Sequence, residues 1–444
     1  MTLYVIIKRY TKTAQSKSAF KVGILMNNRP YKFIDLFAGA GGLSEGFVSQ
    51  GNYIPVAHVE MNKYACDTLK TRASYYYLCE NGKKSIYRKY LRGEIAKEQL
   101  YGSVPSGLLD TIINEEISSV SIESIFQKID DIIINHELGE VDLLIGGPPC
   151  QAFSLMGRAV DAHNMQKDQR NFLYKQYVKF LEHYKPKAFV FENVPGIQTA
   201  GDGKRFNRII GAFRTAGYDV EYHILDAYDY GVLQQRKRMI IFGWRNDLDY
   251  HYPFPEQAHF RVKTNALFRD LAPLHPGEED NRYVSQPSSY IKKTAIRKPH
   301  DILTQHMCRI HNELDRQRYS CVIQAWNNGH RRLKYYDFPD ELRTRTNETS
   351  FPDRYKVVAG DVRYSHTMIA HIAKDGHYFI HPDLNQCRSI SVREAARIQS
   401  FPDDFYFEGP RSAKFTQIGN AVPPLMAKAI AESISQMLAQ EGVE

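Results

Sequence analysis

Cysteine and long apolar runs are scarce in this chain of 444 residues, and each scarcity excludes a class of protein. The six cysteines show no C-x-x-C pair and no Cys/His metal-ligand spacing, so we expect neither a disulfide framework nor a metal site. No segment approaches the roughly 20 consecutive apolar residues that a membrane-spanning helix requires. Internal repeats and low-complexity tracts are missing as well. The sequence is therefore typical of a globular protein that does not contact a membrane.

The N-terminal segment lacks the ordered charged, apolar and small-residue regions of a secretory signal, because Lys8 and Arg9 interrupt its short apolar run. We expect a cytoplasmic protein in which residues 1–30 form an extension. The formal net charge of +8 favours a polyanionic partner, since Lys and Arg bind nucleic-acid phosphates. A basic enzyme without such a partner could carry the same charge, so composition leaves both possibilities open.

The chain exceeds the length at which a single hydrophobic core usually stops growing, so we expect two domains, or one core with a large insertion. Residues 31–252 alternate short β-branched runs with longer amphipathic stretches, which is typical of an α/β sheet with crossover helices. Within them, residues 62–140 contain a helical insertion. Residues 253–407 are irregular and form a second, smaller domain, and residues 408–444 return to the first. The expected strands are Lys32–Phe37, Ile54–Glu60, Val141–Ile145, Ala188–Glu192 and Met239–Gly243.

A glycine-rich turn follows the first expected strand. The segment FIDLF runs directly into Ala38–Gly42, where Gly39 and Gly41 let a ligand approach the backbone closely. A dinucleotide fingerprint would need a third glycine at the position of Ser44, so a nicotinamide cofactor is disfavoured. The second strand ends at Glu60, whose carboxylate can accept hydrogen bonds from ribose hydroxyls. These features predict a site for an adenosine-containing cofactor.

Two further strand ends carry reactive side chains. After VDLLIGG, the prolines Pro148 and Pro149 stiffen the backbone that presents the thiol of Cys150. After KAFVF comes Glu192, a carboxylate that we expect to be desolvated and able to donate or share a proton. Taken singly, Cys150 fits a buried packing thiol and Glu192 fits a structural ion pair or helix cap. Because both meet the glycine turn at one sheet edge, a catalytic site is favoured.

Six ordered segments resemble the motifs of DNA cytosine-5 methyltransferases: FIDLFAGAGGLSEGF, GGPPCQAFS, FVFENVPGI, QQRKRMIIFG, SVREAARIQSFPDDF and FTQIGNAVPP. The resemblance extends from about Lys32 to Ile434, except the insertion and the irregular segment. It implies a Rossmann-like S-adenosylmethionine-dependent methyltransferase sheet with a smaller, irregular target-recognition domain. It also implies S-adenosylmethionine as cofactor, double-stranded DNA as partner, and a place in a bacterial restriction-modification system or a role as an orphan enzyme. A cognate restriction endonuclease would then be a partner in the system and not a bound subunit, and we expect a monomer.

The resemblance also implies catalytic roles. Cys150 would add to C6 of a cytosine flipped out of the duplex, and Glu192 would protonate or hydrogen-bond the ring at N3 and the exocyclic amine. Arg238 would bind O2, and this cation would stabilise the negative charge that the attack pushes into the ring. Arg236 would support the site. Asn193 and Pro149 would hold the cysteine loop and contact the base.

The cofactor site implied by the resemblance comprises Phe37, Gly39, Gly41, Gly42, Glu60 and Asn420. The ring of Phe37 would lie against the adenine, although a core aromatic at a strand end would occupy the same place. Two positions depart from the family pattern. Met61 replaces an aromatic residue, and the segment around Ser121 has no Asp where the family usually holds the adenine amine.

Two loop regions are expected to meet DNA. The segment after Cys150 is polar and predicts a lid, whose Arg158, Lys167 and Arg170 either contact phosphates or are solvated. A hairpin is expected around Asp375-Gly376 as scaffold of the irregular domain. That domain carries side chains suited to base edges or phosphates: Gln305, His306, Arg309, Asn327, Asn328, His330, Arg331, Arg332 and Arg363.

Two other functions remain open. A tRNA cytosine methyltransferase could be built on the same motifs, but a large basic second domain suits recognition of duplex DNA better. A DNA-binding regulator without activity is the other possibility, and the presence of Cys150, Glu192 and Arg238 argues against it.

Overall fold

The structure is a computed structural model that describes residues 29–149, 172–199, 202–344, 346–347, 349 and 351–442. The chain divides into two compact units. Unit 1 comprises the described parts of Met1–Tyr230, Lys237–Gln257 and Val422–Glu444, and unit 2 comprises those of Gly231–Arg236 and Ala258–Ala421. None of the described helices is both long and apolar enough to cross a membrane.

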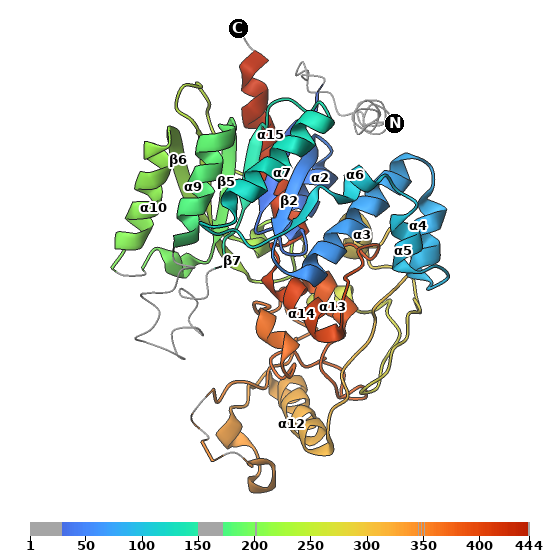
Figure 1. Cartoon of the computed structure of the whole chain (residues 1–444). Coiled ribbons are helices and arrows are strands. Elements are labelled where there is room, and N and C mark those ends of the chain that lie inside the picture. The colour runs from blue at the N-terminus through green and yellow to red at the C-terminus, as the bar shows by residue number, and fades with distance from the viewer. Residues whose placement is uncertain are drawn as a thin grey trace. The chain divides into compact units, whose positions relative to one another are not determined.

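Unit 1 contains a mixed sheet of seven strands within the described residues, in the order β3-β2-β1-β4-β5-β7-β6 (Figure 1). Strands β1 to β5 pair in parallel, whereas β7 is antiparallel to β5 and β6. The predicted α/β class is thus confirmed. The strands are β1 (Tyr31–Leu36), β2 (Tyr53–Glu60), β3 (Ile112–Asn114), β4 (Leu143–Gly146), β5 (Ala188–Asn193), β6 (Tyr218–Asp226) and β7 (Lys237–Arg245).

All five expected strands are present, but the sequence interpretation missed β3 and β6. Strand β3 has only three residues, too few for a periodic pattern. Strand β6, YDVEYHILD, lies at the edge of the sheet, and most of its residues are exposed or half-buried. Because an edge strand needs little apolar surface, its composition resembles that of a loop.

Helices cover both faces of the sheet. On one face lie α7 (Ile122–Asn135), α9 (Leu173–Tyr184) and α10 (Lys204–Thr215), whose buried apolar residues join those of the strands in one core. On the other face, α2 (Gly42–Gln50) packs along α15 (Pro424–Leu438). The C-terminal helix is also tied to the sheet, because the Tyr53 hydroxyl donates to the Ala431 carbonyl at 2.8 Å.

The segment between β2 and β3 is helical, as predicted for the insertion. It forms α3 (Lys63–Glu80), α4 (Lys84–Leu91), α5 (Lys97–Tyr101) and α6 (Ser106–Leu109). These helices enclose a small core of their own, made by Tyr75, Leu78, Tyr87, Leu100 and Val104. The insertion therefore has its own buried aromatic cluster.

Unit 2 contains little regular structure. Its helices are α11 (Ser289–Lys293), α12 (Glu313–Gly329), α13 (Val392–Ile398) and α14 (Arg411–Asn420). Short 3-10 helices complete the described elements: η4 (Pro195–Ile197), η5 (Ala227–Asp229) and η10 (Ala439–Gly442) in unit 1, and η6 (Thr264–Leu267), η7 (Tyr335–Asp337), η8 (Asp340–Leu342) and η9 (Ala370–Ala373) in unit 2.

The hairpin predicted around Asp375-Gly376 is wrong. The structure has η9 before this point, and Ile380 makes only isolated bridges, to Val357 and Ser389. Side chains satisfy local backbone groups in place of a ladder, because the Asp375 carboxylate accepts the His377 amide at 3.0 Å and also pairs with Arg354.

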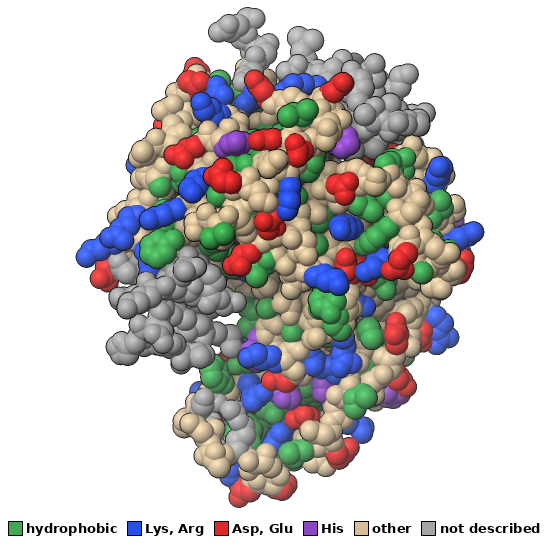
Figure 2. All heavy atoms as spheres, viewed as in Figure 1, with side chains coloured by type: hydrophobic (Ala, Val, Ile, Leu, Met, Phe, Trp, Pro, Cys, Tyr) green, Lys and Arg blue, Asp and Glu red, His purple; other side chains and the backbone are tan. Residues whose placement is uncertain are grey.

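Charges on the drawn face are interspersed. Figure 2 shows Lys and Arg side chains alternating with Asp and Glu across this face, so the net charge of +8 is not gathered into one basic patch there. A nucleic-acid interface on this face would therefore depend on particular residues and not on bulk charge.

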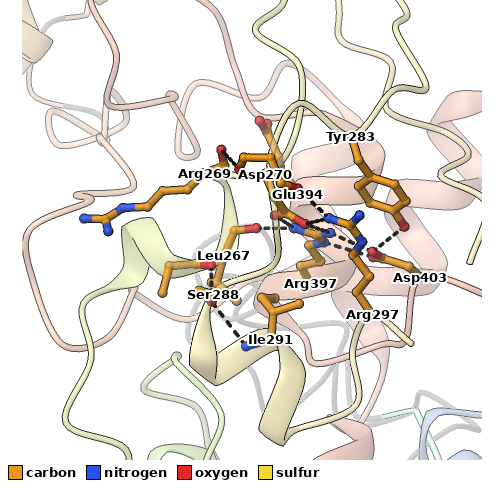
Figure 3. Close-up of polar contacts among 12 residues, drawn as sticks. Leu267, Arg269, Asp270, Tyr283, Ser288, Ile291, Arg297, Glu394, Arg397 and Asp403 are labelled. Atoms are coloured by element: carbon orange, nitrogen blue, oxygen red, sulfur yellow. Dashed lines mark hydrogen bonds and ion pairs between the residues drawn. The ribbon is translucent and has the colours of Figure 1, made fainter. Parts of the chain in front are cut away.

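A buried ion network holds the irregular unit 2 together (Figure 3). The Arg397 guanidinium pairs with Asp403 and with Asp270, each at 2.6 Å, and all three side chains are at most 1% exposed. Arg297 binds Asp270 at 2.8 Å, and the Tyr283 hydroxyl donates to Asp403 at 2.8 Å. Every charge in this cluster is thus countered, which buried charges require.

Candidate active site

The predicted glycine turn has the open geometry that a ligand requires. Phe37, Gly39 and Gly41 have positive φ angles of 56°, 55° and 81°, so the chain turns sharply after β1. A Cβ atom at Gly39 would meet nothing within 4 Å, whereas one at Gly41 would contact Leu69. Phe37 is half-buried against the core of unit 1. The open side of the turn therefore lies at Gly39.

Glu60 joins this turn to the end of β2. Its Oε2 accepts the Gly39 amide at 2.8 Å, and its Oε1 accepts the Asn62 amide at 2.8 Å. Each carboxylate oxygen has a second lone pair that remains for a ligand hydroxyl. Gly42 follows as the first residue of α2. The glycine turn and the acid predicted for the cofactor site are thus brought together.

Asn114 is a residue of this edge that the sequence interpretation missed. It ends β3 opposite Glu60, and its side-chain amide donates to the carbonyls of Glu60 at 3.1 Å and Met61 at 2.9 Å. Ser121, the position around which the family's adenine-amine contact was aligned, instead lies directly before α7. The placement was wrong because β3 is so short, and the only signal for it was the apolar pair Ile112-Ile113 before a polar residue.

A buried acid lies within β1 next to the turn. Desolvation raises the pKa of Asp35 well above its usual value, and the nearby Glu60 charge raises it further. We therefore expect a neutral carboxylic acid at neutral pH. Asp35 then adds no full negative charge beneath the turn.

Glu192 and Arg238 meet at the neighbouring strand ends. Glu192 pairs with Ile240 in the β5–β7 register, which places Arg238 two residues along the same strand. Arg238 Nε lies 2.7 Å from Glu192 Oε1, and the two side chains are only 12% and 15% exposed. Shielding from water strengthens such a pair, so the ion pair considered for Glu192 is present and links the two predicted catalytic residues.

The start of the cysteine loop lies beside this pair. A Cβ atom at Gly147 would collide with Glu192 Oε2, so β4 and β5 approach each other closely just before the two prolines. Pro149 is exposed, as a residue that leads into a loop should be. Cys150, the predicted nucleophile, and the lid residues Arg158, Lys167 and Arg170 lie outside the described residues.

The remaining predicted residues divide between the units. In unit 1, the side chain of Asn193 accepts the Val194 amide at 2.9 Å and so fixes the turn after β5. In unit 2, the buried Arg236 donates to the Met368 carbonyl and, at 3.1 Å, to the Gly419 carbonyl. Asn420 is the last residue of α14 in the same unit. Arg236 therefore links the segment before η9 to the C-terminal end of α14.

Comparison with known proteins shows the family. The C-5 cytosine-specific DNA methylase family matches residues 31–105 and 114–436. The chain is 39% identical over 443 residues to the type II methyltransferase M.Bpa9945I of Bacillus paralicheniformis, covering 91% of this chain and 98% of that protein. It is 32% identical to the type II methyltransferase M.XorII of Xanthomonas oryzae, over 91% of this chain and 84% of that protein.

A solved structure has the same fold. It belongs to a DNA modification methyltransferase encoded within a prophage of E. coli, with a TM-score of 0.59 and 21% identity, over 92% of this chain and 99% of that one. The sheet of unit 1 is accordingly the Rossmann-like sheet of the methyltransferases. The chain belongs to the C-5 cytosine-specific DNA methylase family and is a DNA cytosine-5 methyltransferase of the restriction-modification type.

Proposed function

We propose that this enzyme transfers a methyl group from S-adenosylmethionine to C5 of a cytosine that is flipped out of a specific double-stranded DNA sequence. The observation that carries the proposal is the shielded Glu192–Arg238 pair beside the start of the cysteine loop. A base inside a duplex is beyond the reach of a side chain at a sheet edge, so the cytosine must leave the stack to meet this pair.

The chemistry follows from the charges at this pair. The Cys150 thiolate adds to C6, and the electrons of the C5–C6 double bond move into the ring. Glu192 protonates or hydrogen-bonds the ring at N3 and the exocyclic amine, and Arg238 binds O2, so the negative charge that enters the ring is countered where it develops. Asn193 and Pro149 hold the cysteine loop, and Arg236 supports the site. After methylation at C5, a water molecule takes the C5 proton, the electron pair of that bond re-forms the C5–C6 double bond, and the S–C6 bond breaks to release the thiolate, while any proton held at N3 returns to Glu192.

The glycine turn fits S-adenosylmethionine. Gly39 leaves open space beside its backbone, Glu60 keeps lone pairs for ribose hydroxyls, and the half-buried Phe37 would lie against the adenine. Gly41, Gly42 and Asn420 complete the set implied by the resemblance. When bound, S-adenosylmethionine supplies the methyl group, and the chain's own residues orient the cofactor and the base.

The domain roles are proposals as well. We assign residues 31–252 to catalysis, with a helical insertion within residues 62–140, residues 253–407 to target recognition, and residues 408–444 to a return to the catalytic domain. The enzyme is expected to act as a monomer in the bacterial cytoplasm. A cognate restriction endonuclease is expected to share its DNA sequence without forming a stable complex with it.

Methylation of DNA is the direct test of this function. Purified protein, labelled S-adenosylmethionine and duplex DNA of mixed sequence should give label in DNA, and bisulfite sequencing of DNA from an expressing host should locate one recurring sequence. Transfer RNA added at equal mass should neither take label nor compete. A preparation that binds S-adenosylmethionine but labels no DNA would refute methyl transfer and favour a regulator, and preferential labelling of RNA would favour the tRNA enzyme.

Replacement of Glu60 by alanine is expected to weaken S-adenosylmethionine binding about 10- to 100-fold, because hydrogen bonds to a charged acceptor contribute about 1.5–3 kcal/mol. Calorimetric titration of the cofactor measures this change. The matched control is Glu115→Ala, which removes a carboxylate paired with Lys128 on the surface of the same unit and should leave binding unchanged. Equal affinities for Glu60→Ala and Glu115→Ala would refute the ribose role.

A further inference from the structure

The end of α12 carries a polar cluster that the catalytic chemistry does not use. The apolar side of this helix, including Trp326, packs into a small core within unit 2. Beyond Gly329 the chain turns at His330, whose φ of 54° lies in the left-handed region. The cluster consists of Trp326, His330, Arg332 and Asp361, and we refer to these four residues as the α12 cluster. The helix itself is labelled in Figure 1.

Asp361 organises the cluster. Its Oδ1 accepts the Trp326 indole N–H at 2.9 Å, and its Oδ2 accepts His330 Nε2–H at 2.6 Å. The hydrogen bond from Trp326 and, after it, that from His330 hold the pKa of Asp361 below its usual value. The Arg332 guanidinium lies 5.4 Å above the Trp326 ring, a cation–π contact. One carboxylate and one indole thus fix the positions of two exposed basic side chains.

Stability does not account for this arrangement. His330 and Asp361 are 66% and 41% exposed, and exposed pairs of this kind contribute little to folding. The φ of His330 has a local cause, because this residue ends α12 and its amide donates to the carbonyls of Ala325 and Trp326. What the side-chain contacts achieve is to hold the two basic side chains in fixed positions.

Fixed geometry separates the two ways in which a basic side chain can bind DNA. A phosphate contact requires only a positive charge, which a mobile lysine provides. A contact with a base edge requires donors at set positions, and ordering them in advance lowers the entropy lost on binding. The planar fork of arginine matches the O6 and N7 acceptors of guanine in the major groove. The donors of the α12 cluster are held at set positions, as a contact with a base edge requires. Asn327, Asn328 and Arg331 lie exposed beside the cluster.

We infer that Arg332, set on the Trp326 ring, and His330, held by Asp361, contact base edges of the target DNA in the major groove and so determine which sequence is methylated. This inference rests on the proposed function, since it names the residues by which that enzyme selects its sequence. Trp326 and Asp361 act as positioning residues, and Arg332 supplies the bidentate contact.

The test measures sequence preference on a library of duplexes randomised across the mapped site, read by bisulfite sequencing. Arg332→Ala and Arg332→Lys should both lower discrimination at one base pair about tenfold or more, because lysine keeps the charge but loses the fork. Asp361→Asn should lower discrimination at the same position to a smaller extent. The control is Arg316→Ala, which removes an exposed arginine from the same helix and should leave the preference unchanged.

Each outcome decides between the possible roles. Relaxed preference with normal cofactor binding and a normal unfolding midpoint supports the inference. Unchanged preference in Arg332→Ala overturns it, and so does an equal loss of rate on every sequence with a salt dependence of DNA binding reduced by about one ion, since that result describes a phosphate contact. Wild-type protein that methylates no duplex would overturn the proposed function and this inference with it, a result distinct from the other two.

Discussion

Exchange of Glu192 for glutamine is expected to lower the rate of methyl transfer about 10³-fold, in the range lost when a positioned proton donor is removed. Glutamine keeps the shape of the side chain and can still accept the exocyclic amine, but it cannot donate a proton at N3. It also leaves Arg238 without the carboxylate that now lies 2.7 Å from it. Single-turnover transfer of label from S-adenosylmethionine to the mapped DNA site measures the effect.

The same strand provides a control for loss of an Arg–carboxylate pair. Arg245, at the other end of β7, pairs with Asp247 at 2.7 Å, but that pair is exposed. Asp247→Asn should therefore transfer methyl groups at the wild-type rate. Cofactor affinity should be unchanged in both variants, because Glu192 lies at a different strand end from the glycine turn. A rate for Glu192→Gln within threefold of wild type would contradict the catalytic role.

The catalytic edge of the sheet could be predicted because its residues follow strong local patterns. An apolar run that ends in FAGAGG or in FENV predicts a strand whose carboxyl end carries residues of the site. Parallel pairing of the strands then brings these ends together. The pairing of Glu192 with Arg238 could not be predicted from these local patterns. It depends on β7 running antiparallel to β5 in one particular register, which the sequence pattern does not determine.

Asn114 and the core of unit 2 could not be predicted for different physical reasons. Asn114 follows a strand of three residues, which is too short to show a period. In SVREAARIQSF the helical pattern is visible, but burial of Arg397 depends on Asp270, which is 127 residues earlier in the chain. Sequence patterns favour charged residues on the surface, so a buried ion network in a domain with little regular structure remains hidden until its partners are placed.

Replacement of Arg397 by methionine is expected to destabilise unit 2 by about 3–5 kcal/mol, the usual effect of removing one partner from a buried ion pair. Methionine fills much of the same volume, but Asp403 and Asp270 then remain in a core where both are at most 1% exposed. Urea unfolding followed by circular dichroism measures the loss. Arg282→Met is the control, because it removes an arginine that is 79% exposed and paired with Asp280, and it should leave the unfolding midpoint unchanged.

The loss of unfolding free energy in Arg397→Met should also depend on pH, and the direction of this dependence identifies charge as the cause of the loss. In the wild type, burial would raise the pKa of Asp403, but its ion pair and hydrogen bonds with Arg397 outweigh burial and lower the pKa. The pair therefore stabilises the fold above about pH 4 and ceases to do so as the pH falls through the lowered pKa. Without Arg397, burial raises the pKa of Asp403, so protonation relieves the penalty on acidification. The difference between variant and wild type should be largest near pH 7 and shrink toward pH 4, and a difference independent of pH would assign the loss to packing alone.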